Sequence, residues 1–283
     1  MKLEKKKITI ADIAGLKKNF KNHGLNTVCQ SAKCPNIGEC FKKRTATFLI
    51  LGKNCTRGCK FCGIDKQTPE TVDLHEPLRV ANAVKELGLS YSVITSVTRD
   101  DLADGGAKHF ADTVREIRHL SPETKVEVLV PDFKGEQSSI DIILTAKPDV
   151  FSHNIETVPS LYSKIRSGAD YKRSLDILKY AKAKGFKVKT GIMLGLGESE
   201  NEVFETIKDI KDTGTDILTV GQYLAPTKNH YPVIKEFSEE EFNNIRNFAV
   251  EAGIKTVVCG RYVRSSYLAE ENFKLCSKSE ITA

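Results

Sequence analysis

Short apolar segments rich in β-branched residues alternate along the chain with segments in which apolar residues recur every three or four positions. The first pattern predicts buried strands, and the second predicts amphipathic helices. The predicted strands are residues 47–51, 90–97, 125–131, 150–155, 187–194 and 216–223. The predicted helices between them are residues 78–87, 106–120, 138–146 and 174–185. Six alternating strand–helix units predict a parallel sheet with right-handed crossovers, closed or partly closed.

Two further helices are predicted by capping boxes, in which a serine and a glutamate three residues later hydrogen-bond to each other's backbone N–H. Ser199 with Glu202 begins one helix, and Ser238 with Glu241 begins the other. Apolar spacing also predicts a helix over residues 11–24, ahead of the first strand.

The composition indicates one catalytic domain with short extensions. The chain has 283 residues, 40% of them hydrophobic, which is enough for a substantial core. We expect an N-terminal extension over residues 1–44, a central domain over residues 45–235 and a C-terminal extension over residues 236–283. No apolar run approaches the roughly 20 residues that cross a bilayer, so we expect no membrane insertion.

The charge pattern argues against a nucleic-acid partner. The net charge is +6, from 43 Lys and Arg against 37 Asp and Glu. These basic residues are spread along the chain and form no stripe with aromatic residues. The start of the chain, Met1–Lys7, lacks the apolar core of a signal peptide, and eight cysteines then predict reduced thiols in the cytoplasm.

Six of the eight cysteines lie within residues 29–62 and form two groups of three. Cys55, Cys59 and Cys62 follow the first predicted strand with C-x3-C-x2-C spacing. Three thiolates on one loop can ligate three irons of a [4Fe–4S] cluster, whereas zinc sites and electron-transfer clusters normally use a fourth protein ligand. The fourth iron would be open to chemistry. A zinc knuckle or a fortuitous cluster of cysteines is the alternative.

The other group, Cys29, Cys34 and Cys40, lacks the paired C-x2-C elements of common zinc motifs and predicts a second cluster. Pro35 and Gly38 interrupt regular structure here, so we expect residues 29–40 to form a loop shaped by the metal. The remaining Cys259 and Cys276 fit neither group and are predicted to be inert thiols.

Polar candidates follow the predicted strands, because functional groups in parallel α/β barrels lie where strands end. They are Thr95 and Ser96, then Asn154 and Glu156, then Gly195 and Glu198, and finally Gln222 and Tyr223. Asn154 and Glu156 are alternate residues and should point the same way. A helix cap or a surface pair is the alternative for Asn154 and Glu156, and ordinary turn chemistry is the alternative for Gly195 and Glu198. Asp100, Asp101 and Asp104 are predicted to cap a helix, and His153 to make an ordinary hydrogen bond.

The C-x3-C-x2-C motif resembles that of the radical S-adenosylmethionine (SAM) enzymes. In these enzymes the open iron of the cluster binds SAM, and an electron from the cluster cleaves SAM to a 5′-deoxyadenosyl radical. Three segments, Asn26–Cys29, Ala32–Cys40 and Arg264–Tyr267, resemble the lipoyl synthase family in particular. The resemblance implies a partial (β/α)6 TIM-like barrel of the radical SAM type with N- and C-terminal extensions. It also implies the insertion of two sulfur atoms at C6 and C8 of a protein-bound octanoyl-lysine, which makes the lipoyl cofactor.

Two [4Fe–4S] clusters and SAM are the cofactors that the resemblance implies. Cys29, Cys34 and Cys40 would hold an auxiliary cluster that donates sulfur, with a serine of Arg264–Tyr267 as its fourth ligand. We choose Ser266, although the sequence does not separate it from Ser265.

The implied SAM contacts come from several predicted strand ends. Phe61 would pack beside adenine, Asn154 and Glu156 would bind the ribose and methionyl groups, and residues 191–198 would flank adenine. Arg166 would bind the SAM carboxylate. Plain packing for Phe61 and a structural ion pair for Arg166 are the alternatives. The second strand offers Thr95 and Ser96 in place of the Gly-Gly-Glu common in the superfamily.

The expected partners are an octanoylated lipoyl-carrier domain or H protein as substrate and an electron donor such as ferredoxin or flavodoxin. One alternative is another radical SAM enzyme that inserts sulfur. The other is a non-catalytic two-cluster electron-transfer protein, which the three-cysteine motif argues against because electron carriers favour four-thiolate clusters.

Overall fold

The computed structural model describes residues 20, 23–28, 36–43 and 45–281. Its centre is an eight-stranded sheet in which β1 to β8 follow one another in chain order. β1 pairs antiparallel with β2, and the later neighbours are all parallel. The strands are β1 Asn26–Thr27, β2 Thr45–Ile50, β3 Tyr91–Ser96, β4 Lys125–Leu129, β5 Val150–Ser152, β6 Val188–Leu194, β7 Ile217–Gln222 and β8 Thr256–Gly260.

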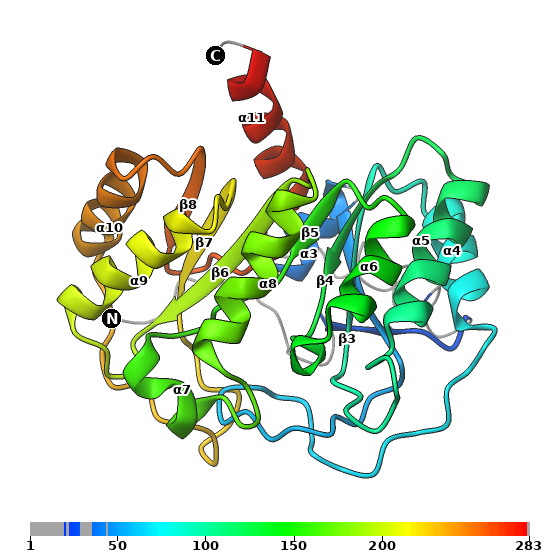
Figure 1. The fold of residues 1–283 in the computed structure, drawn as a ribbon, viewed down its shortest axis with the longest axis horizontal. Coiled ribbons are helices and arrows are strands. Elements are labelled where there is room, and N and C mark those ends of the chain that lie inside the picture. The colour runs from blue at the N-terminus through cyan, green and yellow to red at the C-terminus, as the bar shows by residue number, and fades with distance from the viewer. Residues whose placement is uncertain (1–19, 21–22, 29–35, 44, 282–283) are drawn as a thin grey trace.

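The helices between successive parallel strands lie along one face of the sheet (Figure 1). They are α3 Ile37–Lys42, α4 Glu76–Glu86, α5 Ala107–Leu120, α6 Gln137–Thr145, α7 Pro159–Ile165, α8 Tyr171–Ala183, α9 Glu200–Asp212, α10 Glu239–Glu251 and α11 Ala269–Ile281, with a 3-10 turn η1 at Phe133–Gly135. The long loop between β2 and α4, drawn in blue to cyan, lies at the same end as α7, and α11 projects from the opposite end.

Alternate strand residues form two separate buried layers. Ile94 and Val128 belong to the large core that also contains Phe110 of α5. On the other face of β3, Tyr91 and Val93 pack with Ala269 at the start of α11. The C-terminal helix therefore closes part of the inner face of the sheet.

A buried ion pair lies on this inner face. Nζ of Lys189 on β6 donates to Glu127 on β4 at 2.9 Å, and the Tyr91 hydroxyl donates to the same carboxylate at 2.9 Å. The Lys189 and Glu127 side chains are essentially fully buried. Because each charge has a partner, the pairing offsets part of the free energy that is needed to remove Lys189 and Glu127 from water.

The structure confirms most of the predicted elements. The six predicted strands correspond to β2–β7, with ends that differ by up to three residues, and the four predicted helices correspond to α4, α5, α6 and α8. Both capping boxes are formed, at Ser199 and at Ser238. The pattern missed α7 and the short strand β1. The helix predicted over residues 11–24 lies largely outside the described residues.

The loop predicted for residues 29–40 is wrong at its end, because α3 begins at Ile37. The Asn36 carbonyl accepts hydrogen bonds from the N–H groups of Glu39 and Cys40, both at 3.1 Å. Gly38 is tolerated inside this helix, since a helical glycine costs only about 1 kcal/mol relative to alanine. Residues 29–35, with Cys29 and Cys34, lie outside the described residues.

Within the described part of the chain, none of the helices is both long enough and apolar enough to cross a membrane.

Candidate active site

Cys55, Cys59 and Cys62 lie on the loop after β2, at the carboxyl ends of the strands. Backbone hydrogen bonds tether this loop. The N–H of Cys55 donates to the Asp65 carbonyl at 3.0 Å, and the N–H of Cys62 donates to the Cys59 carbonyl at 3.1 Å. Nε2 of His230 lies 3.1 Å from the Cys62 carbonyl. The three half-buried thiols therefore belong to one anchored loop.

In the absence of a metal, burial and mutual repulsion disfavour the thiolate forms of these cysteines. Burial raises the pKa of the Cys59 thiol to about 11 and that of Cys62 to about 12, and the neighbouring thiols add repulsion. A metal relieves both effects, because it displaces the protons and neutralises the thiolates. No three His, Cys, Asp or Glu side chains of the described residues are arranged to share one metal ion. A cubane cluster differs, since each thiolate binds its own iron, and the loop fits that requirement.

Arg57, between the first two cysteines, fixes the loop to two neighbouring strand ends. Its guanidinium donates to both carboxylate oxygens of Asp100, at 2.7 and 2.9 Å, and to Oδ1 of Asp132 at 2.7 Å. Arg57 is 8% exposed and Asp132 is 1% exposed. Burial acts to raise the pKa of Asp132, but the hydrogen bond and charge of Arg57, together with the nearby His153 and Arg173, outweigh it and lower that pKa. The loop is thus held by a buried, charge-assisted contact.

Asn154 and Glu156 point toward one another, as their spacing predicts. Nδ2 of Asn154 donates to Oε1 of Glu156 at 3.0 Å, whereas Oδ1 of Asn154 is buried without a hydrogen-bond partner. Glu156 has a positive φ of 68°, and its N–H donates to the Gly191 carbonyl at 2.9 Å. A Cβ at position 191 would lie 3.1 Å from Oδ1 of Asn154. Gly191 therefore leaves space for the Asn154 amide, which keeps an acceptor available to a ligand.

Arg166, directly after α7, reaches the same region. Its guanidinium donates to Ser174 Oγ at 3.1 Å, and its Cζ lies 5.3 Å from the centroid of the Tyr162 ring. Arg166 forms no ion pair with a carboxylate of the described residues. The predicted binding of the SAM carboxylate by Arg166 stays a prediction.

His153 is fully buried and has the ordinary hydrogen-bonded role that was predicted. Its Nδ1 lies 2.8 Å from the Val130 carbonyl, and its Nε2 lies 3.1 Å from Ser174 Oγ. Burial and the nearby Arg166 lower the pKa of His153 to about 3. The imidazole is therefore neutral and orients Ser174 and Arg166.

Phe61 contributes to an apolar wall. It packs with Leu196, Met193 and Tyr223, which come from the ends of β6 and β7. The Tyr223 hydroxyl donates to the Tyr231 carbonyl at 2.8 Å and is thereby occupied. These residues provide an apolar surface against which a purine ring could pack.

Thr95 and Ser96 differ in their available groups. The Thr95 hydroxyl donates to the Leu129 carbonyl at 2.8 Å and links β3 to β4. Ser96 Oγ is buried without a hydrogen-bond partner, but consecutive strand residues point to opposite faces. Thr95 can accept a hydrogen bond from a ligand and has no proton left to donate.

The turn after β6 uses its polar groups internally. The Glu198 carboxylate accepts hydrogen bonds from the N–H groups of Gly195 and Leu196. Gln222 is also fully engaged, since its Nε2 donates to the Leu194 and Lys235 carbonyls at 3.1 and 3.0 Å. A Cβ at Gly195 would lie 2.3 Å from that Nε2. Glu198 and Gln222 therefore shape the turn, and their role as direct SAM contacts stays a prediction.

The C-terminal motif Arg264–Tyr267 lies beside α3, which carries Cys40. The Tyr267 hydroxyl donates to the Glu39 carboxylate at 3.2 Å, although the two residues are 228 positions apart. Nδ2 of Asn36 donates to the Tyr262 carbonyl at 2.7 Å. The fold thus brings the segment that contains Ser265 and Ser266 close to α3.

The acidic residues after β3 are only partly as predicted. Asp104 caps α5, because its carboxylate accepts hydrogen bonds from the N–H groups of Gly106 and Lys108 at 2.9 and 2.8 Å. The capping role predicted for Asp100 and Asp101 is wrong. Asp100 binds Arg57 and Asp101 pairs with Arg99 at 2.8 Å, since a buried arginine fork requires a carboxylate.

Sequence comparisons identify the family. A model described as the radical SAM superfamily matches residues 49–210. The lipoyl synthase of Caldicellulosiruptor saccharolyticus is 54% identical over 260 residues, which cover 91% of this chain and 91% of that protein. The lipoyl synthase of Geotalea daltonii is 53% identical over 267 residues, covering 94% and 90%. The chain belongs to the lipoyl synthase family.

Solved structures support the fold of this lipoyl synthase. HydG, a maturase of the [FeFe]-hydrogenase, has a TM-score of 0.60 at 15% identity and covers 94% of this chain and 67% of its own. Methylornithine synthase has a TM-score of 0.54 at 14% identity, covering 90% and 83%. The predicted partial barrel of the radical SAM type is confirmed. The described residues contain seven parallel strands, whereas the sequence predicted six strand–helix units.

The cofactors of the lipoyl synthase family are two [4Fe–4S] clusters and SAM, as predicted. The clustered thiols and the unpartnered acceptor of Asn154 fit these groups. Sequence reasoning missed the role of Arg57 with Asp132. Asp132 follows the third predicted strand, so the rule of strand ends could have found it.

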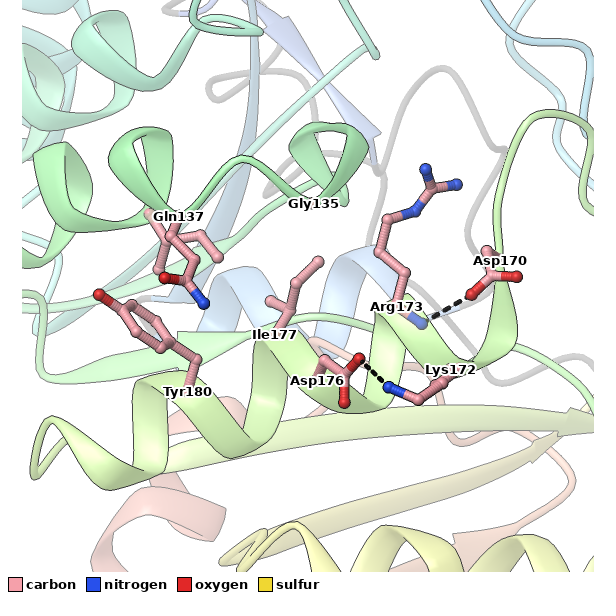
Figure 2. A pocket seen from close by; sticks show the side chains of 9 residues that line it. Gly135, Gln137, Asp170, Lys172, Arg173, Asp176, Ile177 and Tyr180 are labelled. Atoms are coloured by element: carbon pink, nitrogen blue, oxygen red, sulfur yellow. Dashed lines mark hydrogen bonds and ion pairs between the residues drawn. The ribbon is translucent and has the colours of Figure 1, made fainter.

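A cavity of about 240 Å³ lies elsewhere, between α6 and α8 on the outer layer (Figure 2). Ile140, Ile177 and Tyr180 line its inner part, and the ion pair of Lys172 with Asp176 lies along its edge. It contains none of the predicted site residues.

Proposed function

We propose that this lipoyl synthase inserts sulfur at C6 and C8 of a protein-bound octanoyl-lysine chain by using two separately held clusters. The observation that supports this most directly is the contact of Tyr267 with Glu39, which brings the serine motif beside Cys40. When bound, SAM and the clusters supply the carbon radical and the sulfur. The chain itself binds, orients and shields the reacting groups.

In this proposal, Cys55, Cys59 and Cys62 hold the cluster that binds SAM, and Arg57 fixes the shape of their loop. Cys29, Cys34, Cys40 and Ser266 hold the auxiliary cluster. A serine oxygen is a harder ligand than a thiolate and must lose a proton to bind iron, so this corner of the cluster should be labile. Lability suits a cluster that gives up its sulfur.

For SAM, we propose that Asn154 and Glu156 bind its ribose and methionyl groups and that Arg166 binds its carboxylate. The unpartnered Oδ1 of Asn154 and the lack of an ion pair for Arg166 among the described residues support these roles. Phe61 would contact adenine. Thr95 would accept a hydrogen bond from the amino group. Gly195, Glu198, Gln222 and Tyr223 would support the wall behind the cofactor.

The remaining parts of the proposal concern the surroundings of the reaction. The substrate is an octanoylated lipoyl-carrier domain or H protein, and the reductant is a ferredoxin or flavodoxin. Residues 1–44 and 236–283 form the extensions that carry the auxiliary cluster, around a barrel over residues 45–235. A reducing cytoplasm suits the thiols.

The test uses anaerobically reconstituted protein, SAM, a chemical reductant and an octanoylated carrier domain. Cys40→Ala should abolish lipoyl product and retain SAM cleavage to 5′-deoxyadenosine, whereas Cys59→Ala should abolish both. Cys259→Ala, outside both groups, is the matched control and should retain both. Parallel loss of both activities in Cys40→Ala would contradict the two-cluster assignment, and a methylthiolated product would indicate a different radical SAM reaction.

A further inference from the structure

Four lysines surround the loop of Cys55, Cys59 and Cys62 at the molecular surface. Lys60 lies between two of the cysteines, the Lys66 side chain lies over Gly58, and Lys164 and Lys228 come from α7 and the loop after β7. We call Lys60, Lys66, Lys164 and Lys228 the rim lysines. All four are exposed.

Backbone contacts hold three of the rim lysines close together. The N–H of Lys60 donates to the Ile165 carbonyl at 2.8 Å, next to Lys164, and the Lys60 carbonyl accepts from the N–H of Tyr231 at 2.9 Å. Nζ of Lys164 lies 5.3 Å from the centroid of the Tyr231 ring. Lys228 precedes His230, whose Nε2 lies 3.1 Å from the Cys62 carbonyl. The patch is therefore built onto the cluster loop itself.

The charge of this patch is not neutralised internally. No rim lysine forms an ion pair with a carboxylate of the described residues. Lysines on the outer helices differ, since Lys172 pairs with Asp176 and Lys208 with Glu205 along their own helices. Asp65 is the acidic residue next to Lys66 within the loop. A locally positive surface of this kind attracts an acidic partner and raises its association rate.

We propose that the rim lysines dock a small acidic one-electron carrier of the flavodoxin type, an inference that rests on the proposed function. The carrier loses one electron and the cluster on Cys55, Cys59 and Cys62 gains it, without transfer of a proton. The position of the patch favours the reductant over the octanoylated carrier. A reductant needs to approach only the SAM-binding cluster, whereas the octanoyl carbon must reach the auxiliary cluster. The described residues next to the proposed auxiliary-cluster site are those of α3 and residues 261–267.

The experiment compares two ways of reducing the reconstituted protein. In one, a recombinant acidic flavodoxin with its NADPH-dependent reductase supplies electrons. In the other, photoreduced 5-deazariboflavin, a small uncharged reductant, replaces it. The variant is Lys164→Glu/Lys228→Glu, which leaves the cysteine loop intact. The matched control is Lys172→Glu/Lys208→Glu, which makes the same charge change on the outer helices.

We expect the rim variant to lose about tenfold or more of the flavodoxin-driven rate of 5′-deoxyadenosine formation and most of its salt dependence. Its iron content and its deazaflavin-driven rate should match those of the unmodified protein and the control. An unchanged flavodoxin-driven rate would overturn the proposal. So would a deazaflavin-driven loss of lipoyl product, which would assign the patch to the octanoylated carrier. If the unmodified protein made no lipoyl product with deazaflavin, the proposed function would fail independently of the docking surface.

Discussion

Arg57 links the cysteine loop to two neighbouring strand ends of the barrel. Its side chain is 8% exposed, and it binds both Asp100 and the buried Asp132. Arg57→Met should lower the free energy of unfolding by about 3 kcal/mol, because removal of one partner leaves buried carboxylates less well compensated. Chemical denaturation of the reconstituted protein measures this change.

Arg79→Met is the control for that substitution. Arg79 pairs with Asp73 at 2.8 Å, but both side chains are substantially exposed, so the loss should stay below about 1 kcal/mol. Arg57→Lys should recover only part of the stability, since an ammonium cannot reproduce the planar fork. Equal effects of Arg57→Met and Arg79→Met would show that the buried network does not stabilise the loop.

For individual residues, the sequence alone predicted their location in the site better than it predicted their contacts. Asn154 and Glu156 do lie together as predicted, although β5 ends before them and Glu156 has a positive φ, so strand periodicity alone does not explain their contact. The sequence could not show that the Gln222 side-chain amide donates hydrogen bonds to the Leu194 and Lys235 carbonyls, because Lys235 comes from a loop whose path depends on tertiary packing. The rule of strand ends could have located Asp132, but it could not have shown that Arg57 is its partner.

Helix α10 illustrates how local chemistry fixes an element. Ser238 Oγ accepts a hydrogen bond from the N–H of Glu241, whose carboxylate accepts from the N–H of Ser238. Ser238→Ala should lower the free energy of unfolding by about 1 kcal/mol. The N–H of Glu241 loses its acceptor, and the Glu241 carboxylate, which accepts from the N–H of residue 238, loses its hydrogen bond from the serine hydroxyl. Thermal or urea unfolding checks this value. Ser163→Ala, an exposed position in α7, should change stability by less than about 0.5 kcal/mol, and a similar loss there would rule out the capping explanation.

Elements with strong periodicity or a capping box were predictable, and short ones were not. Runs such as residues 187–194 are long enough for their apolar pattern to indicate a buried strand, and the structure confirms β6 there. Helix α3, six residues long, has too few turns to show a period. Its position depends on contacts with Tyr262 and Tyr267 from the far end of the chain, which sequence spacing does not encode.

Those contacts organise the molecule as a whole. Asn36 and Glu39 near the start of the described chain meet Tyr262 and Tyr267 near its end, and Lys43 pairs with Glu271 at 2.8 Å. Residues 36–43 and residues 262–271 are therefore held together, away from the loop that carries the other cysteine group. In such an arrangement the auxiliary cluster site should be separable from the SAM site.

Asn36→Ala combined with Tyr267→Phe should separate the two sites. The double variant removes one side-chain contact to the Tyr262 carbonyl and one to Glu39, so the serine motif should no longer be held against α3. Iron content should fall from about eight toward about four atoms per chain, the equivalent of one cubane. SAM cleavage should persist while lipoyl product is lost. Tyr180→Phe, which removes a hydroxyl bound to Asp141 on the outer layer, is the control and should keep all the iron. Retention of about eight irons with loss of product would instead indicate that these contacts align the substrate.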